Sequence, residues 1–281
     1  METIENKEYG GERPLFAAHD LRLVNVTFNE GESALKRCRN IEAEACTFKG
    51  KYPFWHTRGF RLDHCLFEPG ARAALWYSDN CEMRNTIVNA PKMFREMDGV
   101  VLDRVAIPDA QETFWNCRNI DIRDVTTDNA DYIFMHCANI RIDRYRQNGN
   151  YSFQYARNVE ISNAVINSKD AFWETDNVTV RDSELHGEYL GWHSHRLHLV
   201  NCHISGTQPL CYCTGLVLEN CTFDADCDLA FEESELQAIV KSHITSVKNP
   251  TTGYIKAPSI GEIIIDGNIL APADCRIETN D

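Results

Sequence analysis

The sequence predicts an all-β fold: a single-stranded, right-handed parallel β-helix with three faces and about 12 coils of 19–21 residues. The first observation behind this prediction is an eight-residue phrase that recurs at steps of 19–21 residues. A fixed period of about 20 residues is typical of a solenoid. The phrase begins at Leu21, Ile41, Phe60, Cys81, Val100, Ile120, Ile140, Val159, Val178, Leu197 and Leu216, and a further copy begins at Ile263.

The second observation is the alternation of apolar and polar residues inside the phrase. The first and third positions are apolar, for example Val178 and Val180, so one face of a short strand points inward. The fifth position favours Asn and Asp, which adopt left-handed turns at low cost. We therefore expect a tight turn there, followed by a second short strand that ends in an apolar residue such as Phe48 or Phe223.

The third observation is an aromatic cluster before many phrases, as in Phe54-Trp55-His56. It predicts a third strand in each coil. Asn or Gly stands directly before most phrases, and both residues reach positive φ easily, so a second tight turn is expected there. Parallel crossovers are almost always right-handed, which sets the expected hand of the helix.

Three other solenoids fit the sequence less well. Leucine-rich repeats share the period, but their Leu-x-x-Leu-x-Leu motif and their helical segment are missing. Pentapeptide coils would need four equal units per turn, and steps of 19 and 21 residues break that rule. Left-handed hexapeptide coils require a strict repeat of six residues, which the chain does not show.

The chain is expected to form one domain, because a solenoid has no fixed size limit. Residues 1–20 are expected to cap the open end, residues 21–223 to form the regular coils, and residues 224–281 to form an enlarged irregular coil and a C-terminal coil. The net charge of −14 argues against a nucleic-acid partner. Neither a signal peptide nor an apolar run of 18 residues is found, so we expect a cytoplasmic protein that does not span a membrane.

The cysteines fall mainly in two columns of small residues. Because stacked coils lie about 4.8 Å apart, these columns predict buried free thiols and neither disulfides nor a metal site, and no cofactor is expected. The two columns contain Cys46, Cys65, Cys202 and Cys221, and Cys38, Cys117, Cys137 and Cys213. Cys211, Cys227 and Cys275 lie outside them.

Two neighbouring columns on the third strand are the candidates for function. One is rich in Trp and the next in hydrogen-bonding or ionisable residues, and a local bulge would turn both toward solvent. Flat aromatic faces with polar rims suit sugar rings. The alternative is that these aromatic residues pack under neighbouring loops. The candidate ligand-binding residues are Trp55, His56, Trp76, Tyr77, Trp115, Asn116, Tyr155, Trp173, Trp192 and Tyr212, with Arg72 and Arg95 to hold an anion.

Any catalytic chemistry would involve Glu174 and His193, which share a column on adjacent coils, with His136 in support. A histidine beside a carboxylate can act as a general base. Glu174 has no acidic neighbour in its column on the next coils, which disfavours a hydrolase with paired carboxylates.

The phrase resembles those of the pectin-lyase-like right-handed β-helix superfamily. The whole chain is similar to an uncharacterised bacterial family within it, a resemblance carried by Gly31–Lys36, Lys51–Trp55, Ala71-Arg72, Trp76-Tyr77, Pro91–Arg95, Gly187–Trp192, Gln208–Cys213 and Ser246–Pro250. The resemblance implies the fold and no reaction. The calcium-binding aspartates of pectate lyases and the three aspartates of polygalacturonases have no counterpart in this sequence.

Two functions therefore remain open. The first is a carbohydrate-binding or carbohydrate-active protein whose ligand is a saccharide or an acidic sugar. The second is a non-catalytic scaffold whose aromatic residues dock another protein or a second copy, in a homo-oligomer.

Overall fold

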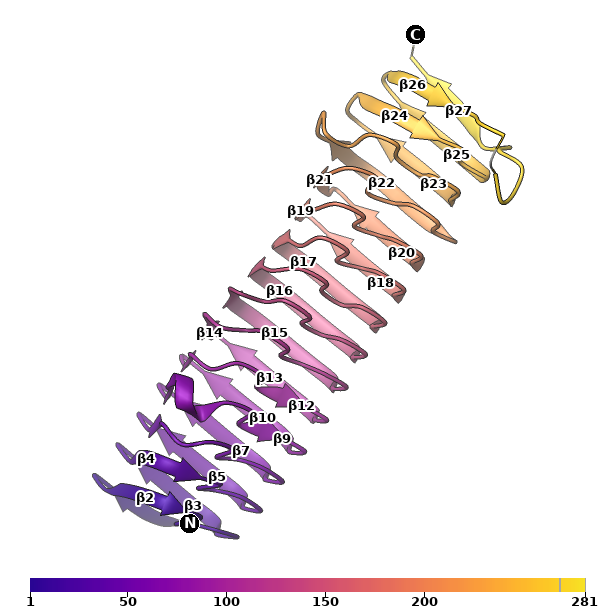
Figure 1. The fold of residues 1–281 in the computed structure, drawn as a ribbon. Coiled ribbons are helices and arrows are strands. Elements are labelled where there is room, and N and C mark those ends of the chain that lie inside the picture. The colour runs from indigo at the N-terminus through magenta and orange to yellow at the C-terminus, as the bar shows by residue number, and fades with distance from the viewer. Residues whose placement is uncertain (268, 281) are drawn as a thin grey trace. The chain divides into compact units, whose positions relative to one another are not determined.

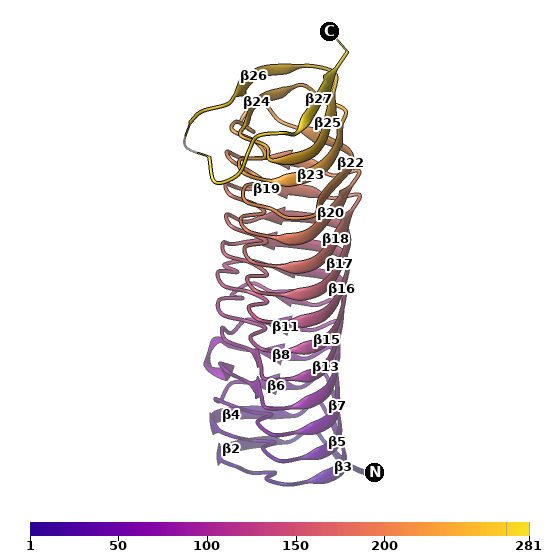
Figure 2. The same cartoon turned by 90° about the vertical axis from the view of Figure 1, so that its right-hand side faces the viewer.

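The computed structural model describes residues 1–267 and 269–280, which form 27 β-strands and one short 3₁₀ helix. The chain divides into two units, Met1–Arg146 and Gln147–Asp281. In each unit the backbone winds as a right-handed, single-stranded parallel β-helix, with successive coils stacked on one another (Figure 1, Figure 2). The predicted fold class is confirmed.

Three groups of elements form the first unit. On the face formed by the first half of the phrase lie β1 (Glu2–Glu5), β3 (His19–Val24), β5 (Arg39–Glu44), β7 (Arg58–Asp63), β10 (Asp79–Arg84), β13 (Asp98–Asp103), β15 (Arg118–Thr127) and β16 (Ala138–Asn148). On the second face lie β2 (Glu8–Glu12), β4 (Thr27–Glu32), β6 (Thr47–Phe48), β8 (Leu66–Phe67), β11 (Ile87–Val88) and β14 (Ala106–Ile107). The third face has β9 (Leu75–Trp76), β12 (Phe94–Arg95) and the 3₁₀ helix η1 (Pro69–Ala71).

The second unit repeats this arrangement with fewer elements on the second face. Its first face contains β17 (Arg157–Asn167), β18 (Asp176–Arg181), β20 (His195–Val200), β22 (Leu216–Phe223), β23 (Glu235–Val240), β25 (Thr252–Ala257) and β27 (Arg276–Thr279). The remaining strands are β19 (Glu184–His186), β21 (His203–Ser205), β24 (Ile244–Lys248) and β26 (Ile260–Ile264).

The strand register reproduces the predicted columns. In the first unit Ile41 pairs with Phe60, which pairs with Cys81, and all three are buried. In the second unit Val178 pairs with Leu197 in the same way. Identical columns also stack aromatic rings, since Phe48 lies 4.7 Å from Phe67. The core of each unit is therefore a set of vertical files of apolar side chains.

The turns at both ends of the phrase use left-handed residues. Asn25 and Asn85 have φ of 52° and 46°, and Asn40, directly before a phrase, has 51°. Ala45 and Arg104 adopt the same conformation without the local hydrogen bonding of Asn, at a cost of about 1 kcal/mol each. The close packing of coils above and below holds these residues in that geometry.

The third face differs from the expectation of a strand in every coil. In the described part of the first unit its strand pairing is confined to β9 with β12 and to single bridges such as Arg95 with Trp115. The cause is that each coil has two or more left-handed residues on this face, for example Tyr52 at φ 57° and His56 at φ 59° in one coil. Hydrogen bonds between coils nevertheless continue, as from the His56 N–H to the Trp76 carbonyl at 3.2 Å.

The left-handed His56 is the predicted irregularity between the two core columns. Phe54 and Thr57, three residues apart, both point inward and are fully buried. The intervening Trp55 is half-buried and His56 is exposed. In this coil both candidate columns turn away from the core, as the sequence analysis expected, whereas Gln154 and Cys211 of the same columns are buried.

The chain has more coils than predicted, about 15 turns in the described residues against the expected 12 or so. Residues 1–20, expected as a cap, contribute β1 and β2, which pair with β3 and β4. In the expected irregular segment, β23, β25 and β27 continue the first face. The phrase proposed at Ile263 is wrong, because Ile263 lies in β26 and pairs with Val247 of β24. Any inward-facing strand shows the same alternation, so the pattern alone could not assign its face.

All twelve cysteines are free thiols, and every one except Cys275 is buried. Burial raises the pKa of Cys38 to about 11 and that of Cys227 to about 12. These thiols are therefore protonated packing groups at neutral pH. None of the described helices has the length and hydrophobicity to cross a membrane.

Candidate functional site

The candidate residues form two strips, one in each unit. The first-unit strip consists of two columns. Its inner column is Lys36, Trp55, Trp76, Arg95, Trp115 and Met135, and its outer column is Arg37, His56, Tyr77, Glu96, Asn116 and His136. The second-unit strip also consists of two columns. Its inner column is Gln154, Trp173, Trp192, Cys211 and Glu232, and its outer column is Tyr155, Glu174, His193, Tyr212 and Glu233.

In the first-unit strip the aromatic rings stack on one another along the coil direction. The rings of Trp55 and Trp76 lie 5.6 Å apart and 9° from parallel, and those of His56 and Tyr77 lie 5.2 Å apart and 13° from parallel. Each ring covers a face of the ring on the next coil. Flat stacking of a sugar on these faces, which the sequence analysis expected, is therefore blocked between these coils.

The three indole N–H groups of the first-unit strip are also occupied. Those of Trp55, Trp76 and Trp115 each donate to a backbone carbonyl of the following coil at 2.6 Å. The accepting carbonyls belong to Ala73, Lys92 and Tyr132. These bonds fix the orientation of the Trp side chains and link each coil to the next.

Arg95 is enclosed within this stack. Its guanidinium carbon lies 4.3 Å from the Trp76 ring centroid and 4.4 Å from that of Trp115, and its Nη2 lies 3.6 Å from a carboxylate oxygen of Glu112. The Arg95 side chain is only 20% exposed, and its Nε and Nη2 atoms are buried without a hydrogen bond. Its charge is balanced by two aromatic faces and one carboxylate, so an anion from solvent has little access to it.

The cations beside the first-unit strip have different surroundings. Lys92 forms a 3.0 Å ion pair with Glu112, and Arg72, directly after η1, is exposed. The pKa of His56 is lowered, first by partial burial and then by the charges of Lys36 and Arg37. Arg72 is thus the accessible member of the predicted anion-binding pair, and Arg95 is the enclosed one.

The second-unit strip is aligned coil by coil through its backbone. Glu174 N–H donates to the Trp192 carbonyl at 3.0 Å, and His193 N–H donates to the Cys211 carbonyl at 3.1 Å. Trp173 and Trp192 therefore lie on adjacent coils, as do Glu174 and His193. The sequence alignment of these columns is confirmed by the hydrogen bonds.

The two Trp side chains of the second-unit strip lack the bonds seen in the first. Among the described residues, neither the Trp173 nor the Trp192 indole N–H donates a hydrogen bond, and no aromatic ring contacts Trp173. Trp192 meets the Tyr189 ring edge-on at 5.0 Å. Both Trp side chains are half-buried, and their donors are left for water or a ligand.

The candidate catalytic residues are not joined by direct contacts in the second unit. His193 stacks on Tyr212 at 5.0 Å and 18°, and the described residues show no hydrogen bond or ion pair between Glu174 and His193. His136 belongs to the first unit, whereas Glu174 and His193 belong to the second. The geometry provides no preassembled acid–base pair.

Acidic groups lie in several coils of the second-unit strip. Glu232 pairs with Lys248 at 2.7 Å, and the pKa of Tyr212 is raised by burial and by the nearby Glu232. Asp170 is buried, and this burial raises its pKa. Glu174 and Glu233 of the outer column add two carboxylates, and neither forms an ion pair within the described residues.

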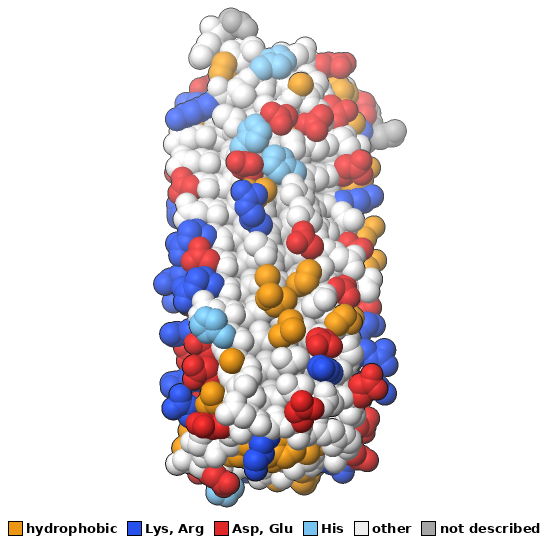
Figure 3. Space-filling view, turned by 90° about the vertical axis from the view of Figure 1, so that its left-hand side faces the viewer, with side chains coloured by type: hydrophobic (Ala, Val, Ile, Leu, Met, Phe, Trp, Pro, Cys, Tyr) orange, Lys and Arg blue, Asp and Glu red, His pale blue; other side chains and the backbone are white. Residues whose placement is uncertain are grey.

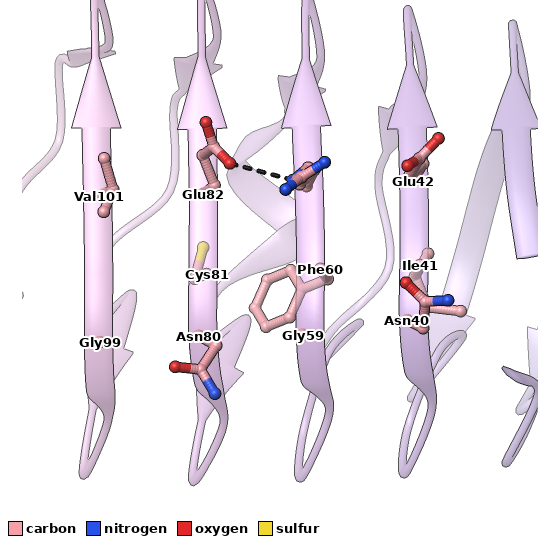
Figure 4. A pocket seen from close by; sticks show the side chains of 11 residues that line it. Asn40, Ile41, Glu42, Gly59, Phe60, Asn80, Cys81, Glu82, Gly99 and Val101 are labelled. Carbon is pink, nitrogen blue, oxygen red and sulfur yellow. Dashed lines mark ion pairs between the residues drawn. The ribbon is translucent and has the colours of Figure 1, made fainter. Parts of the chain in front are cut away.

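The structure also reveals a groove that the sequence analysis missed. It has a volume of about 390 Å³ and lies on the outer face of β5, β7, β10 and β13 (Figure 4). Arg61 crosses it to pair with Glu82 at 3.0 Å, while Glu42 lines the same side. Gly59 and Gly99 leave it open at the turn, where most other coils have Asn. Those two glycines were the available signal in the sequence.

Histidines gather on another face of the second unit, outside the strip. The rings of His186 and His203 lie 6.0 Å apart, and His203 is 3.2 Å from Asp224. Figure 3 shows histidine side chains next to acidic ones in the upper part of this face. No group of three or more potential metal ligands occurs within residues 1–267 and 269–280.

A family model described as "Protein of unknown function (DUF3737)" matches residues 2–278. A comparison with curated proteins gives no match. Among solved structures, the chain is similar to the A-module of the mannuronan C-5 epimerase AlgE4 of Azotobacter vinelandii, with 10% identity, coverage of 100% of this chain and 91% of that chain, and a TM-score of 0.32.

A family 28 exopolygalacturonase of Yersinia enterocolitica is similar over 98% of this chain and 72% of its own, with 10% identity and a TM-score of 0.34. At TM-scores this low the likeness carries no information about the site. The strand pairing establishes the fold, and the family match confirms the expected relationship to a family of unknown function.

Proposed function

This chain belongs to the DUF3737 family, and we propose that it binds a saccharide along the second-unit strip. The observation that carries this proposal is the pair of indole N–H groups of Trp173 and Trp192, which have no acceptor among the described residues. Half-buried donors on aromatic side chains are well suited to sugar hydroxyl oxygens.

The outer column supplies the complementary groups. Tyr155 is 40% exposed, and Glu174 and His193 are also exposed, so carboxylate, imidazole and phenol groups line the same edge as the indoles. Sugar hydroxyls both donate and accept hydrogen bonds, and they can satisfy such a mixed set. A row of equivalent positions on successive coils suits a chain of sugar units better than a single one.

The charge of this strip favours a neutral saccharide. Glu174 and Glu233 lie on the outer column, and Lys248 is already paired with Glu232. The acidic sugar considered from the sequence depended on Arg72 and Arg95. Arg95 is enclosed between Trp76 and Trp115, and Arg72, although exposed, belongs to the first unit and not to this strip. Carboxylates without nearby free cations disfavour an anionic ligand.

Binding without catalysis is the form of the proposal that the geometry supports. Glu174 and His193 make no contact that would orient a general base. Glycan-array screening, followed by calorimetry with the oligosaccharide that binds best, tests the proposal. Trp173→Phe and Trp192→Phe should each weaken binding about tenfold, because each loses one hydrogen bond of about 1.4 kcal/mol.

Trp76→Phe is the matched control, because its indole N–H is bonded within the protein. Its affinity for the same oligosaccharide should stay within about twofold of the unchanged protein. If no glycan binds, or if the Trp76 variant loses as much affinity as the Trp173 variant, the proposed site is wrong.

The proposed location of this activity is the cytoplasm. The free thiols support it, since all twelve cysteines are unpaired and secreted proteins commonly oxidise theirs. Fractionation of cells that produce the protein tests this location. Recovery outside the cytoplasmic fraction would contradict it.

A further inference from the structure

The last coil of the second unit ends the core in exposed isoleucines. Ile244, Val247 and Ile255 are completely buried, and their register partners one coil later are Ile260, Ile263 and Ile277. Ile263 is 49% exposed, and Ile260 and Ile277 are half-buried. Three apolar columns thus change from complete burial to partial exposure at the last coil that the structure describes.

This end also has unpaired strand edges. Within the described residues β27 pairs only with β25, and β26 pairs only with β24. A free edge beside exposed apolar side chains is a template for further strand pairing unless it is protected. Ile265, directly after β26, is 57% exposed and extends the apolar surface.

The first coil of the first unit ends its core differently. Glu2 occupies the column of Leu21, and Tyr9 closes the ring stack of Phe28 at 5.6 Å. Strands β1 and β2 contain four glutamates, Glu2, Glu5, Glu8 and Glu12. Charges on an edge strand are a common protection against strand pairing. The last coil differs in that the charges of β27, Arg276 and Glu278, have opposite signs, so they do not repel a second strand that carries the same pair.

We propose that the last coil is the interface of a homodimer with two-fold symmetry, in which β27 pairs antiparallel with β27 of a second copy. With Ile277 at the two-fold axis, Arg276 of one protomer lies opposite Glu278 of the other, and the reverse pair forms as well. The two ion pairs are a direct result of the order Arg276-Ile277-Glu278. Within one protomer Arg276 and Glu278 already approach to 2.8 Å, so both charges lie on the same side of the strand.

Head-to-tail stacking is a poorer solution. Ile4 pairs with Leu23, and Ile277 continues the column of Leu218; Leu23 and Leu218 both occupy the third position of the phrase. A first coil added onto β27 in parallel register would therefore place Glu5 opposite Glu278. It would also bring Glu2 into a core column. Like charges in directly opposite positions destabilise strand pairs. The two-fold arrangement avoids both costs and closes after two copies.

Light scattering coupled to size exclusion, over a range of protein concentrations, tests the proposal. The unchanged protein should have the mass of a dimer at micromolar concentration. Ile263→Asp with Ile277→Asp should weaken the dimer at least a hundredfold, since charge in the centre of an apolar interface is poorly tolerated. Ile4→Asp, at the other end of the core, is the matched control and should leave the dimer intact.

A charge exchange tests the antiparallel register without relying on a destabilised end. Arg276→Glu places Glu opposite Glu, and Glu278→Arg places Arg opposite Arg, so each variant alone should be monomeric. Mixing the two should restore a dimer, because every cross-protomer pair is then Glu with Arg. Circular dichroism and thermal unfolding establish that each variant is folded.

Three results would overturn the proposal. One is a monomeric mass for the unchanged protein at all concentrations up to about 100 μM, because the dissociation constant would then be far weaker than that of a specific interface of this kind. Another is a dimer that Ile4→Asp abolishes and the double Ile variant does not. The third is a mixture of the two charge variants that stays monomeric.

Discussion

The first-unit strip and the second-unit strip occupy equivalent columns of the same repeat, yet their Trp side chains have different hydrogen-bond partners and neighbours. In the first, Trp76 and Trp115 enclose Arg95, and their N–H groups bond to the next coil. In the second, Trp173 and Trp192 have no such bonds. An outward-facing Trp column can therefore either link neighbouring coils or offer its side chains to a ligand, and the hydrogen bonds of the indole N–H groups decide which.

The largest expected effect concerns the stack of Arg95 between Trp76 and Trp115 in the first-unit strip. Arg95→Ala removes a guanidinium that is packed between two indole rings and leaves a gap in the stack. We expect a loss of about 3 kcal/mol in the free energy of unfolding, since cation–π contacts of desolvated groups and the packed side-chain stem both disappear. Urea denaturation followed by Trp fluorescence measures this change.

The exposed Arg72 provides the control for that measurement. Arg72→Ala should change the free energy of unfolding by less than about 0.5 kcal/mol, as is usual for surface positions. Equal losses for the two arginines would mean that the packing of Arg95 between the two indole rings does not stabilise the fold. The distinction between the strips would then have no energetic basis.

A smaller difference is expected between equivalent Trp residues. Trp115→Phe leaves the Tyr132 carbonyl without its 2.6 Å donor and should cost about 1.5 kcal/mol of unfolding free energy. Trp173→Phe breaks no hydrogen bond and should cost less, about 0.5 kcal/mol. Chemical denaturation of both variants compares them, and an equal cost would remove the contrast between the strips.

The smallest expected effect is a pH dependence in the first-unit strip. The pKa of His56 in the folded protein lies below its ordinary value of 6.5, because of burial and then the neighbouring Lys36 and Arg37. The unfolded chain therefore binds a proton more readily, so stability falls as the pH drops through 6.5 and rises again above it. His56→Gln should make the unfolding midpoint less sensitive to pH between about 7 and 5.

The charges of Lys36 and Arg37 provide the check on this assignment. They are the second cause of the lowered pKa of His56, so Lys36→Gln combined with Arg37→Gln should also flatten the pH profile, but less than His56→Gln does. Thermal unfolding at several pH values measures both variants, and an unchanged profile for His56→Gln would contradict the assignment.

Much of the fold could be predicted because each coil repeats the same local requirements. The columns through Ile41, Phe60 and Cys81 were visible in the sequence, and the register confirms them. The third face was harder, because a left-handed Tyr77 or His56 has no marked sequence preference. Close contacts from the coils on either side force that conformation, and a single coil does not encode it.

The candidate residues were found by column, but their roles depended on side-chain geometry. That Trp and His columns turn outward followed from the three-residue spacing of core positions such as Phe54 and Thr57. That Arg95 is enclosed did not follow, because it depends on Trp at both neighbouring coils and on Glu112. The groove at Gly59 and Gly99 was missed for the same reason. Its shape comes from side chains that are absent on alternate coils.

The amino-acid sequence by itself determined the winding of the chain, since a period of 19–21 residues with inward apolar positions can bury its core only by stacking coil on coil. It also predicted that two columns of the third face turn toward solvent, as Trp55 and His56 do. The tertiary structure alone decided which indoles are bonded and which are free, and where the core ends uncovered at Ile263 and Ile277. The physical reason is that these properties belong to contacts between coils about 20 residues apart, and no local pattern within one coil contains them.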